Sequence, residues 1–281
     1  MTTVHGLVNE MIQLQELIVA DMQKKATMPS VQLEELEHAI EDLKKDLPRP
    51  VQTHFSRLLQ KHPEAIVPVW AEACTGCGMR LTRSLANAVQ RADHLERCPN
   101  CTRYLYFPDQ MVERIQRRRV YGEAQKTGIA RFSSPELMLP ALKGTTPTEV
   151  LSELAERLQE EGFVEDASHL CDLALQREMI VSTAIEKGLA FPHVRGAEGG
   201  GLEMVVGIHR KGIHFGGPGR TLTRIFFFTV IPTATSAFYL KLLSGLCRVF
   251  REKEPREALL AAKTQKEIWK ALIKTTKKTI K

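Results

Sequence analysis

The stretch that decides the fold is LALQREMIVSTAIEKGLAFPHVR, residues 173–195. Its first part carries apolar residues at helical spacing, and its end contains a strand-like apolar run, residues 189–191. Pro192 breaks that run, and an ionisable ring, His193, follows at once. Glycine at position 196 allows the chain to turn. The stretch therefore predicts a helix, a short strand and a histidine at the mouth of a buried strand.

Helices and strand-like runs alternate on both sides of this stretch. The segment from Thr146 to Glu149 is a strong helix start, with a threonine cap, a proline at the first helical position and a glutamate at the third. Further strand-like runs cover residues 202–208 and 225–231, and two helices are expected to close the chain, one over 236–250 and one from Thr264. His209 and His214, beside a predicted turn, are expected at the surface. Strands mixed with helices of this length predict an α/β layered domain over residues 131–281.

The first 65 residues have helical periodicity. Apolar residues step by three and four from Val4 to Ile18 and again from Leu33 to Leu47, which gives each helix one narrow apolar seam. Two such helices predict an antiparallel hairpin, and a short third helix is expected near residues 51–62. The fold class is therefore multidomain, α+β or α/β: a helical hairpin, a cysteine module and a mixed β-sheet flanked by helices.

The cysteine module spans residues 66–108. Four of the six cysteines form the pattern C-x2-C-x20-C-x2-C, namely Cys74, Cys77, Cys98 and Cys101. Four thiolates satisfy tetrahedral Zn²⁺, and the two-residue gap lets the backbone turn around each pair of sulfurs. With four protein ligands no coordination position is open, so the pattern predicts a structural zinc ion in a small module that lacks a large core.

Charge and hydropathy limit the remaining possibilities. The net charge is +6, which permits nucleic acid or an acidic protein as a partner without requiring either. Residues 109–130 form a basic linker that contains Arg117, Arg118 and Arg119. No apolar run reaches the length of a membrane span, and the N-terminus has no signal pattern, so we expect a cytoplasmic protein.

The front half, with ACTGCGMRL and RCPNCTRYLYF, resembles the bacterial coiled-coil proteins that end in a C4-type zinc ribbon. Two departures stand out: the helices are much shorter than in that family, and Thr102 stands where glycine is usual. The resemblance implies an adaptor that faces a protein or nucleic acid.

The back half resembles the enzyme IIA domain of the mannitol–fructose class of the phosphoenolpyruvate:sugar phosphotransferase system, including its nitrogen-regulatory branch. The residues that carry the resemblance are the pair Arg177-Glu178, the pair Ser182-Thr183, and Gly188-Leu189-Ala190-Phe191-Pro192-His193. It implies that His193 accepts a phosphoryl group from a phosphohistidine on a carrier of the HPr type. A neutral imidazole is a good nucleophile near pH 7. Arg177 would supply the positive charge, and Ser182 or Thr183 would donate hydrogen bonds.

One position departs from the family pattern. Tyr239 aligns with the second histidine of the family, and a tyrosine donates a hydrogen bond but carries no positive charge. Either Lys187 or Lys241 restores that charge, or the site is slow or has drifted from phosphotransfer to signalling alone. For phosphoryl transfer we further expect His193 to lie open in a shallow hollow lined by cations.

Two functions remain open at this point. In the first, which is the one favoured, the protein is a cytoplasmic regulatory phosphoacceptor in which the state of His193 controls contact with an unidentified regulatory target and the zinc ribbon serves for docking. It would then carry out protein-histidine phosphotransfer. In the second, the enzyme IIA fold is a non-catalytic scaffold, and the zinc ribbon and the basic linker contact nucleic acid or the transcription machinery.

Overall fold

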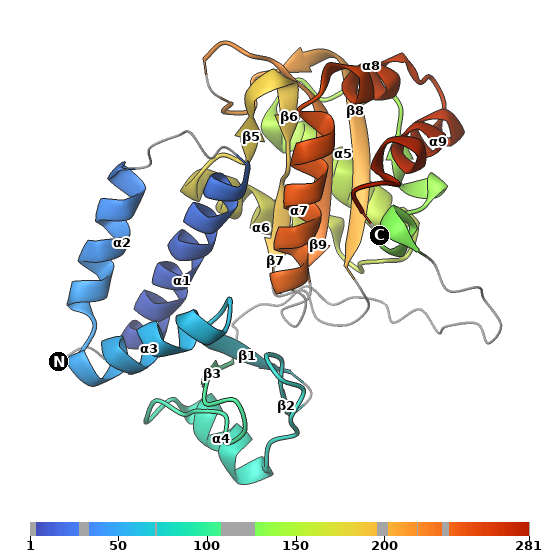
Figure 1. The fold of residues 1–281 in the computed structure, drawn as a ribbon. Coiled ribbons are helices and arrows are strands. Elements are labelled where there is room, and N and C mark those ends of the chain that lie inside the picture. The colour runs from blue at the N-terminus through green and yellow to red at the C-terminus, as the bar shows by residue number, and fades with distance from the viewer. Residues whose placement is uncertain are drawn as a thin grey trace. The chain divides into compact units, whose positions relative to one another are not determined.

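The computed structural model describes residues 4–27, 34–70, 72–107, 127–195, 202–217, 219–231 and 236–280 (Figure 1). The chain forms two compact units, residues 1–111 and 112–281. The connection between the two helices of the predicted hairpin, residues 28–33, and the arginine cluster of the basic linker lie outside the described residues.

The first unit begins with three helices, α1 (Val4–Thr27), α2 (Glu34–Asp46) and α3 (Arg49–Lys61). Met11 and Leu14 on α1 are buried together with Ile40 on α2 and Leu47 directly after it, as the two apolar seams predicted. Because Pro48 cannot donate a backbone hydrogen bond, it ends α2 and serves as the N-cap residue of α3. The predicted third helix is therefore present.

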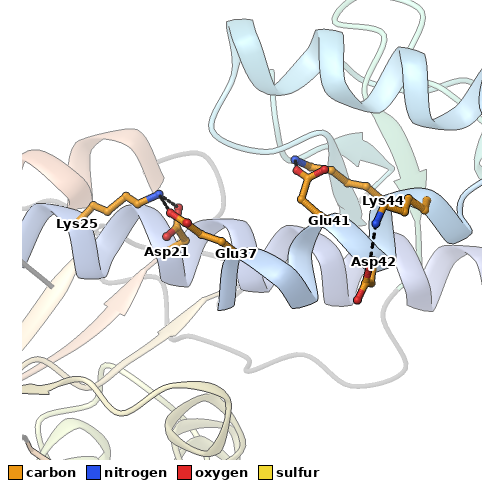
Figure 2. Close-up of polar contacts among 7 residues, drawn as sticks. Asp21, Lys25, Glu37, Glu41, Asp42 and Lys44 are labelled. Carbon is orange, nitrogen blue, oxygen red and sulfur yellow. Dashed lines mark hydrogen bonds and ion pairs between the residues drawn. The ribbon is translucent and has the colours of Figure 1, made fainter. Parts of the chain in front are cut away.

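Surface ion pairs join the outer faces of α1 and α2 (Figure 2). The ammonium of Lys25 lies 2.9 Å from Asp21 on its own helix and 2.8 Å from Glu37 on α2. These two carboxylates raise the pKa of Lys25, the Glu37 hydrogen bond most. Since Lys25 is near the end of α1 and Glu37 near the start of α2, the helices run antiparallel.

The rest of the first unit is a small β-structure built on the chain that follows α3. Its elements are β1 (Ile66–Trp70), β2 (Ala73–Cys74), α4 (Arg83–Arg91) and β3 (Tyr104–Tyr106). The strands lie in the order β2-β1-β3, with β1 antiparallel to β2 and parallel to β3. The side-chain amide of Gln15 on α1 bonds the backbone of Ala65 and Ile66 at the start of β1. One buried cluster joins the helices to Ile66 of β1 and Tyr104 of β3, and a second lies within the cysteine module around Cys74 and Cys98.

The second unit is a mixed sheet between two layers of helices (Figure 1). Its helical elements are η1 (Gly128–Arg131), η2 (Pro135–Leu137), α5 (Pro147–Glu160), α6 (Ala167–Ile180), η3 (Glu186–Gly188), α7 (Ser236–Phe250), α8 (Lys253–Ala261) and α9 (Gln265–Thr276). Its strands are β4 (Met138–Leu139), β5 (Ala184–Ile185), β6 (Leu189–Ala190), β7 (His193–Arg195), β8 (Glu203–Ile213) and β9 (Thr223–Ile231). The order is β4-β8-β9-β6-β5, and β7 also pairs with β9. Helices α5 and α6 cover one face and α7 the other.

Strand β9 shows why this sheet needs cover on both sides. Phe226, Phe227 and Phe228 are consecutive and all fully buried, although successive side chains point to opposite faces. The ring of Phe227 packs against Phe250 of α7 with centroids 5.0 Å apart. An uninterrupted apolar run of this kind is typical of a strand buried on both faces.

The local signals and the structure agree at the helix starts and differ elsewhere. Thr146 and Glu149 form the predicted capping box of α5. Helix α8 was not predicted, and it lies between the two helices expected to close the chain. Pro255 within its first turn resembles a helix break in the sequence. The turn predicted beside His209 is a bulge within β8, and His209 is buried, with its Nδ1 accepting from the backbone of Gly212.

Candidate functional site

The four predicted zinc ligands meet in one cluster. Their sulfur atoms all lie within 4.8 Å of one another. The sulfurs of Cys74 and Cys101 are 3.7 Å apart, and those of Cys77 and Cys98 are 3.6 Å apart. Zn–S bonds of about 2.3 Å in a tetrahedron place sulfurs about 3.8 Å apart, so the cluster has the size that zinc requires.

Protonation of these thiols follows their surroundings. Burial raises the pKa of Cys74 and of Cys98. Burial alone would raise the pKa of Cys77 as well, but hydrogen bonds, the backbone N–H of Met79 foremost, lower it to about 7. Since zinc binds thiolates, metal binding at neutral pH must release protons from Cys74 and Cys98.

The second cysteine pair is held by the helices before it. Thr102 has a φ of 61°, a left-handed conformation that is unfavourable for a β-branched residue. Its carbonyl accepts a 2.9 Å hydrogen bond from Nε2 of the buried His54 on α3. The neighbouring Arg103 is also buried, and it donates to the carbonyls of Glu64 and Gly76. The His54 bond connects the second cysteine pair to α3 at Thr102, where glycine was expected. The Arg103 bonds connect the same pair to the chain after α3 and to Gly76 between the first two cysteines.

The second candidate site surrounds His193, the first residue of β7. This strand pairs with β9 in parallel, with His193 opposite Thr229. Arg177, near the end of α6, donates from Nε to Nε2 of His193 over 3.2 Å and from Nη1 to the carbonyl of Val181 over 3.0 Å. Arg177, which was expected to supply positive charge at this site, thus contacts the ring of His193.

The hydrogen bonds indicate the tautomer of the ring. Nδ1 of His193 lies 3.1 Å from the carbonyl oxygen of Phe191, and a carbonyl only accepts. Nδ1 therefore carries the proton, and the lone pair on Nε2 accepts from Arg177. The nitrogen that faces the guanidinium is thus the nucleophilic one.

The exposure of the ring differs from the expectation. His193 is only 2% exposed, so the prediction of an open imidazole in a shallow hollow is wrong. The ring packs against Tyr239 in the first turn of α7, with ring centroids 5.2 Å apart and a tilt of 40°. Tyr239 is itself 1% exposed. The ring of His193, in contact with Tyr239 and Arg177, is therefore almost entirely covered.

Ser182 and Thr183 lie beside the site and are bonded to a third residue, Glu178. The Glu178 carboxylate accepts from the Ser182 hydroxyl at 2.7 Å and from the Thr183 backbone and hydroxyl at 2.6 and 2.7 Å. Burial raises the pKa of Glu178, against the opposing effect of these bonds and of Arg177. A direct bond from either hydroxyl to a phosphoryl group stays a prediction. The Arg-Glu and Ser-Thr pairs are visible in the sequence, but the bonds from Glu178 to Ser182 and Thr183 were not predicted.

The lysines expected to replace the missing charge lie elsewhere. The Lys187 ammonium is 3.4 Å from the carbonyl of Arg251, which directly follows α7. Tyr239 lies at the opposite end of that helix, in its first turn. Twelve helical residues span about 18 Å, which is too far for contact with His193. Lys241 is exposed and lies two positions after the buried Tyr239, which places it on another side of α7. The expectation that either lysine serves this site is therefore wrong, and Arg177 is the cation that contacts the ring.

Comparison with known proteins now adds the family. Residues 132–275, just over half of the chain, match the family described as "Phosphoenolpyruvate-dependent sugar phosphotransferase system, EIIA 2". The chain belongs to this family. Its EIIA domain is the second unit, and His193, Arg177 and Tyr239 all lie within the matched residues. Residues 73–105 match a C4-type zinc ribbon domain, and these include all four cysteines of the cluster. The cluster is accordingly a structural zinc site.

Three relatives each match about half of the chain. A nitrogen regulatory protein of Bradyrhizobium diazoefficiens is 29% identical over 148 residues, which is 51% of this chain and 94% of the relative. The crystal structure of the nitrogen regulatory protein IIA-Ntr of Neisseria meningitidis covers 50% of this chain and 96% of its own, with 20% identity and a TM-score of 0.46. IIA mannitol of Escherichia coli covers 50% and 97%, with 19% identity and a TM-score of 0.42. Within the described residues, no helix is long and apolar enough to cross a bilayer.

Proposed function

We propose that the EIIA domain is a regulatory phosphoacceptor and that His193 receives a phosphoryl group from a phosphohistidine on an HPr-type carrier. The observation that carries the proposal is the Nε2 lone pair of His193 held 3.2 Å from the Arg177 guanidinium. The family match supports phosphotransfer, and the match to a relative named a nitrogen regulatory protein supports a regulatory role.

In the proposed step, the Nε2 lone pair of His193 attacks the phosphorus of the donor. A P–N bond to Nε2 forms while the P–N bond of the donor breaks, and its electron pair returns to the donor ring. The proton stays on Nδ1 of His193, where the Phe191 carbonyl accepts from it. Arg177 leaves Nε2 and turns its N–H groups to the phosphoryl oxygens, which a guanidinium fork suits.

Because the ring is buried, transfer requires a local rearrangement. Arg177 must release the ring, and Tyr239 must move enough to admit the phosphoryl group. The energy of one or two hydrogen bonds, about 1–3 kcal/mol, is within reach of carrier binding. Once bound, a doubly charged group at this position would change the contacts of the domain surface and so alter recognition of a target.

The test uses two phosphoryl donors. The full chain is incubated with phosphoenolpyruvate, enzyme I and a phosphocarrier, and separately with phosphoramidate, a small donor that needs no carrier. We expect an acid-labile gain of one phosphoryl group by mass spectrometry, which His193→Ala abolishes and His214→Ala, at an exposed histidine of the same domain, retains. Phosphorus NMR should place the group on Nε2.

A second function is favoured by one observation, the 2% exposure of His193. A ring closed in by Arg177 and Tyr239 suits a domain that keeps the EIIA fold as a scaffold and acts through its zinc ribbon. In that case neither donor phosphorylates the folded chain, and the ribbon with the basic linker binds nucleic acid or a protein target. Affinity that falls steeply with salt would indicate nucleic acid.

A further inference from the structure

A hollow lies in the EIIA domain, away from His193. It has a volume of about 370 Å³ and is open to solvent on one side. Four cations line it: Lys187 of η3, Arg224 of β9, and Lys253 and Arg256 of α8. None of these four side chains takes part in the site around His193.

The hollow is built by three elements that the fold brings together. Helix α8 contributes residues 253, 256, 257 and 260, whose spacing places them on one helix face. Lys187 has a φ of 66° and Gly188 a φ of 75°. A Cβ at Gly188 would lie 2.8 Å from the Leu222 carbonyl, so η3 packs directly on the chain that enters β9. Lysine in the left-handed region costs about 1 kcal/mol, and such strain is often found at functional positions.

The positive charges of the hollow are only partly compensated. Arg256 donates to three carbonyls at the end of α7, those of Phe250, Arg251 and Glu252. Lys253 is 3.5 Å from Glu257, which is the one carboxylate among the lining residues. Nε of Arg224 is buried and has no hydrogen-bond partner among the described residues. Four cations against one carboxylate leave a net charge of about +3, which favours an anion with two or more charges.

The wider charge distribution points the same way. Residues 187–281 contain 18 lysines and arginines and 6 acidic residues, whereas residues 127–186 contain 4 and 11. The hollow belongs almost wholly to the basic part of the domain. An anion approaching it is therefore attracted over a longer range than contact alone provides.

Part of the lining of the hollow is apolar. Leu222, which is 38% exposed, and Ile225 and Leu260 line the hollow beside the cations. A site that combines guanidinium groups with apolar surface fits a phosphate group joined to an organic part, because arginine forks match phosphate oxygens. We propose that this hollow binds a small organic phosphate that carries at least two negative charges.

This site is distinct from the phosphoacceptor. His193 pairs with β9 at Thr229, whereas the hollow reaches β9 at Arg224 and Ile225. Four strand residues span about 13 Å, and α8 and β7 lie toward opposite ends of the sheet (Figure 1). The proposal therefore stands whether or not His193 accepts a phosphoryl group, and His193→Ala should leave binding at the hollow unchanged.

The experiment measures binding to the full chain by titration calorimetry, with pyrophosphate, ADP and citrate as probes. We expect saturable binding of ADP and pyrophosphate at one site per chain and weaker binding of citrate. Arg224→Gln should weaken both phosphate probes about tenfold through the loss of charge-assisted bonds. Lys274→Gln removes the same charge from an exposed position on α9 and should have little effect. Leu222→Ala should weaken ADP while leaving pyrophosphate unchanged.

Several results would overturn the proposal. Absence of saturable binding by either phosphate probe would do so, as would equal losses in Arg224→Gln and Lys274→Gln, which would indicate attraction to net charge alone. Citrate binding as tightly as ADP would show that the site does not select phosphate. Binding of heparin without ADP or pyrophosphate would assign the basic surface to a long polyanion instead. Arg224→Lys, which keeps the charge but loses the fork, should retain binding between wild type and Arg224→Gln, so a folding defect in one variant does not decide the outcome.

Discussion

Replacement of Arg177 by glutamine tests the site at the cation that the structure places against His193. In the structure Nε of Arg177 is 3.2 Å from the nitrogen of His193 that would carry the phosphoryl group. A phosphoryl group there meets two guanidinium N–H groups, and each hydrogen bond to a charged group contributes about 1.5–3 kcal/mol. Glutamine retains one neutral donor, worth about 1 kcal/mol. The expected loss is about 3 kcal/mol, which is about a hundredfold in transfer rate.

The assay follows transfer from a phosphorylated carrier to the chain by rapid quench and mass spectrometry. Arg177→Gln also loses the bond to the Val181 carbonyl, so a fall in stability of about 1 kcal/mol is expected and is measured by thermal unfolding. Arg177→Lys keeps the charge and should recover part of the rate. Arg157→Gln serves as the matched control, because Arg157 pairs with Glu160 and Glu161 on α5 and lacks any role at the site. If folded Arg177→Gln accepts phosphate as fast as wild type, the assignment of Arg177 is wrong.

Three further predictions follow from other parts of the chain. Cys77→Ser should reduce bound zinc, measured by atomic emission on purified protein, whereas Cys171→Ser, at a cysteine outside the cluster, should retain one zinc per chain; equal zinc in both would contradict the ligand assignment. Because burial raises the pKa of Glu178, its contribution to stability is fully present below its unfolded pKa of about 4.5 and is lost as pH rises through the folded value. The stability difference between wild type and Glu178→Gln should therefore fall over that window in urea titrations, and a difference independent of pH would refute the raised pKa. Gly207→Ala would place a methyl group 2.7 Å from the side chain of Leu142 and 2.9 Å from that of Leu154 on α5, so it should lower stability by about 1–3 kcal/mol. An unchanged melting temperature would show that β8 is not packed against these two leucines.

Much of the fold was readable because its signals are local. The capping box at Thr146 and the threonine cap at Thr264 act on amides three residues away, so sequence spacing is enough to find them. Helix α8 was not predicted because its apolar pattern is short and weak and because Pro255 resembles a helix break. His209 was misplaced because its burial depends on the bulge in β8, which is a property of strand pairing.

The candidate site likewise combines features that local sequence patterns predicted with contacts that they did not. The cysteine spacing alone identified the zinc ligands, and the residues around His193 identified the family. The approach of Arg177 to the ring was expected from the family pattern, and the structure shows it. The capture of the Ser182 and Thr183 hydroxyls by Glu178 was not expected, since a sequence does not show which acceptor a hydroxyl will meet.

By itself the sequence determined the helical hairpin, the zinc ligands, the alternation of helices and strands, and the histidine on which a phosphotransfer function would depend. Only the tertiary structure decided that His193 is covered, that Lys187 faces away from it, and that Lys187 joins Arg224 and α8 around a separate hollow. The physical reason is the range of the interactions. Caps, turns and paired cysteines depend on neighbours a few residues apart, whereas exposure and charge clustering depend on elements that pack together from distant parts of the chain.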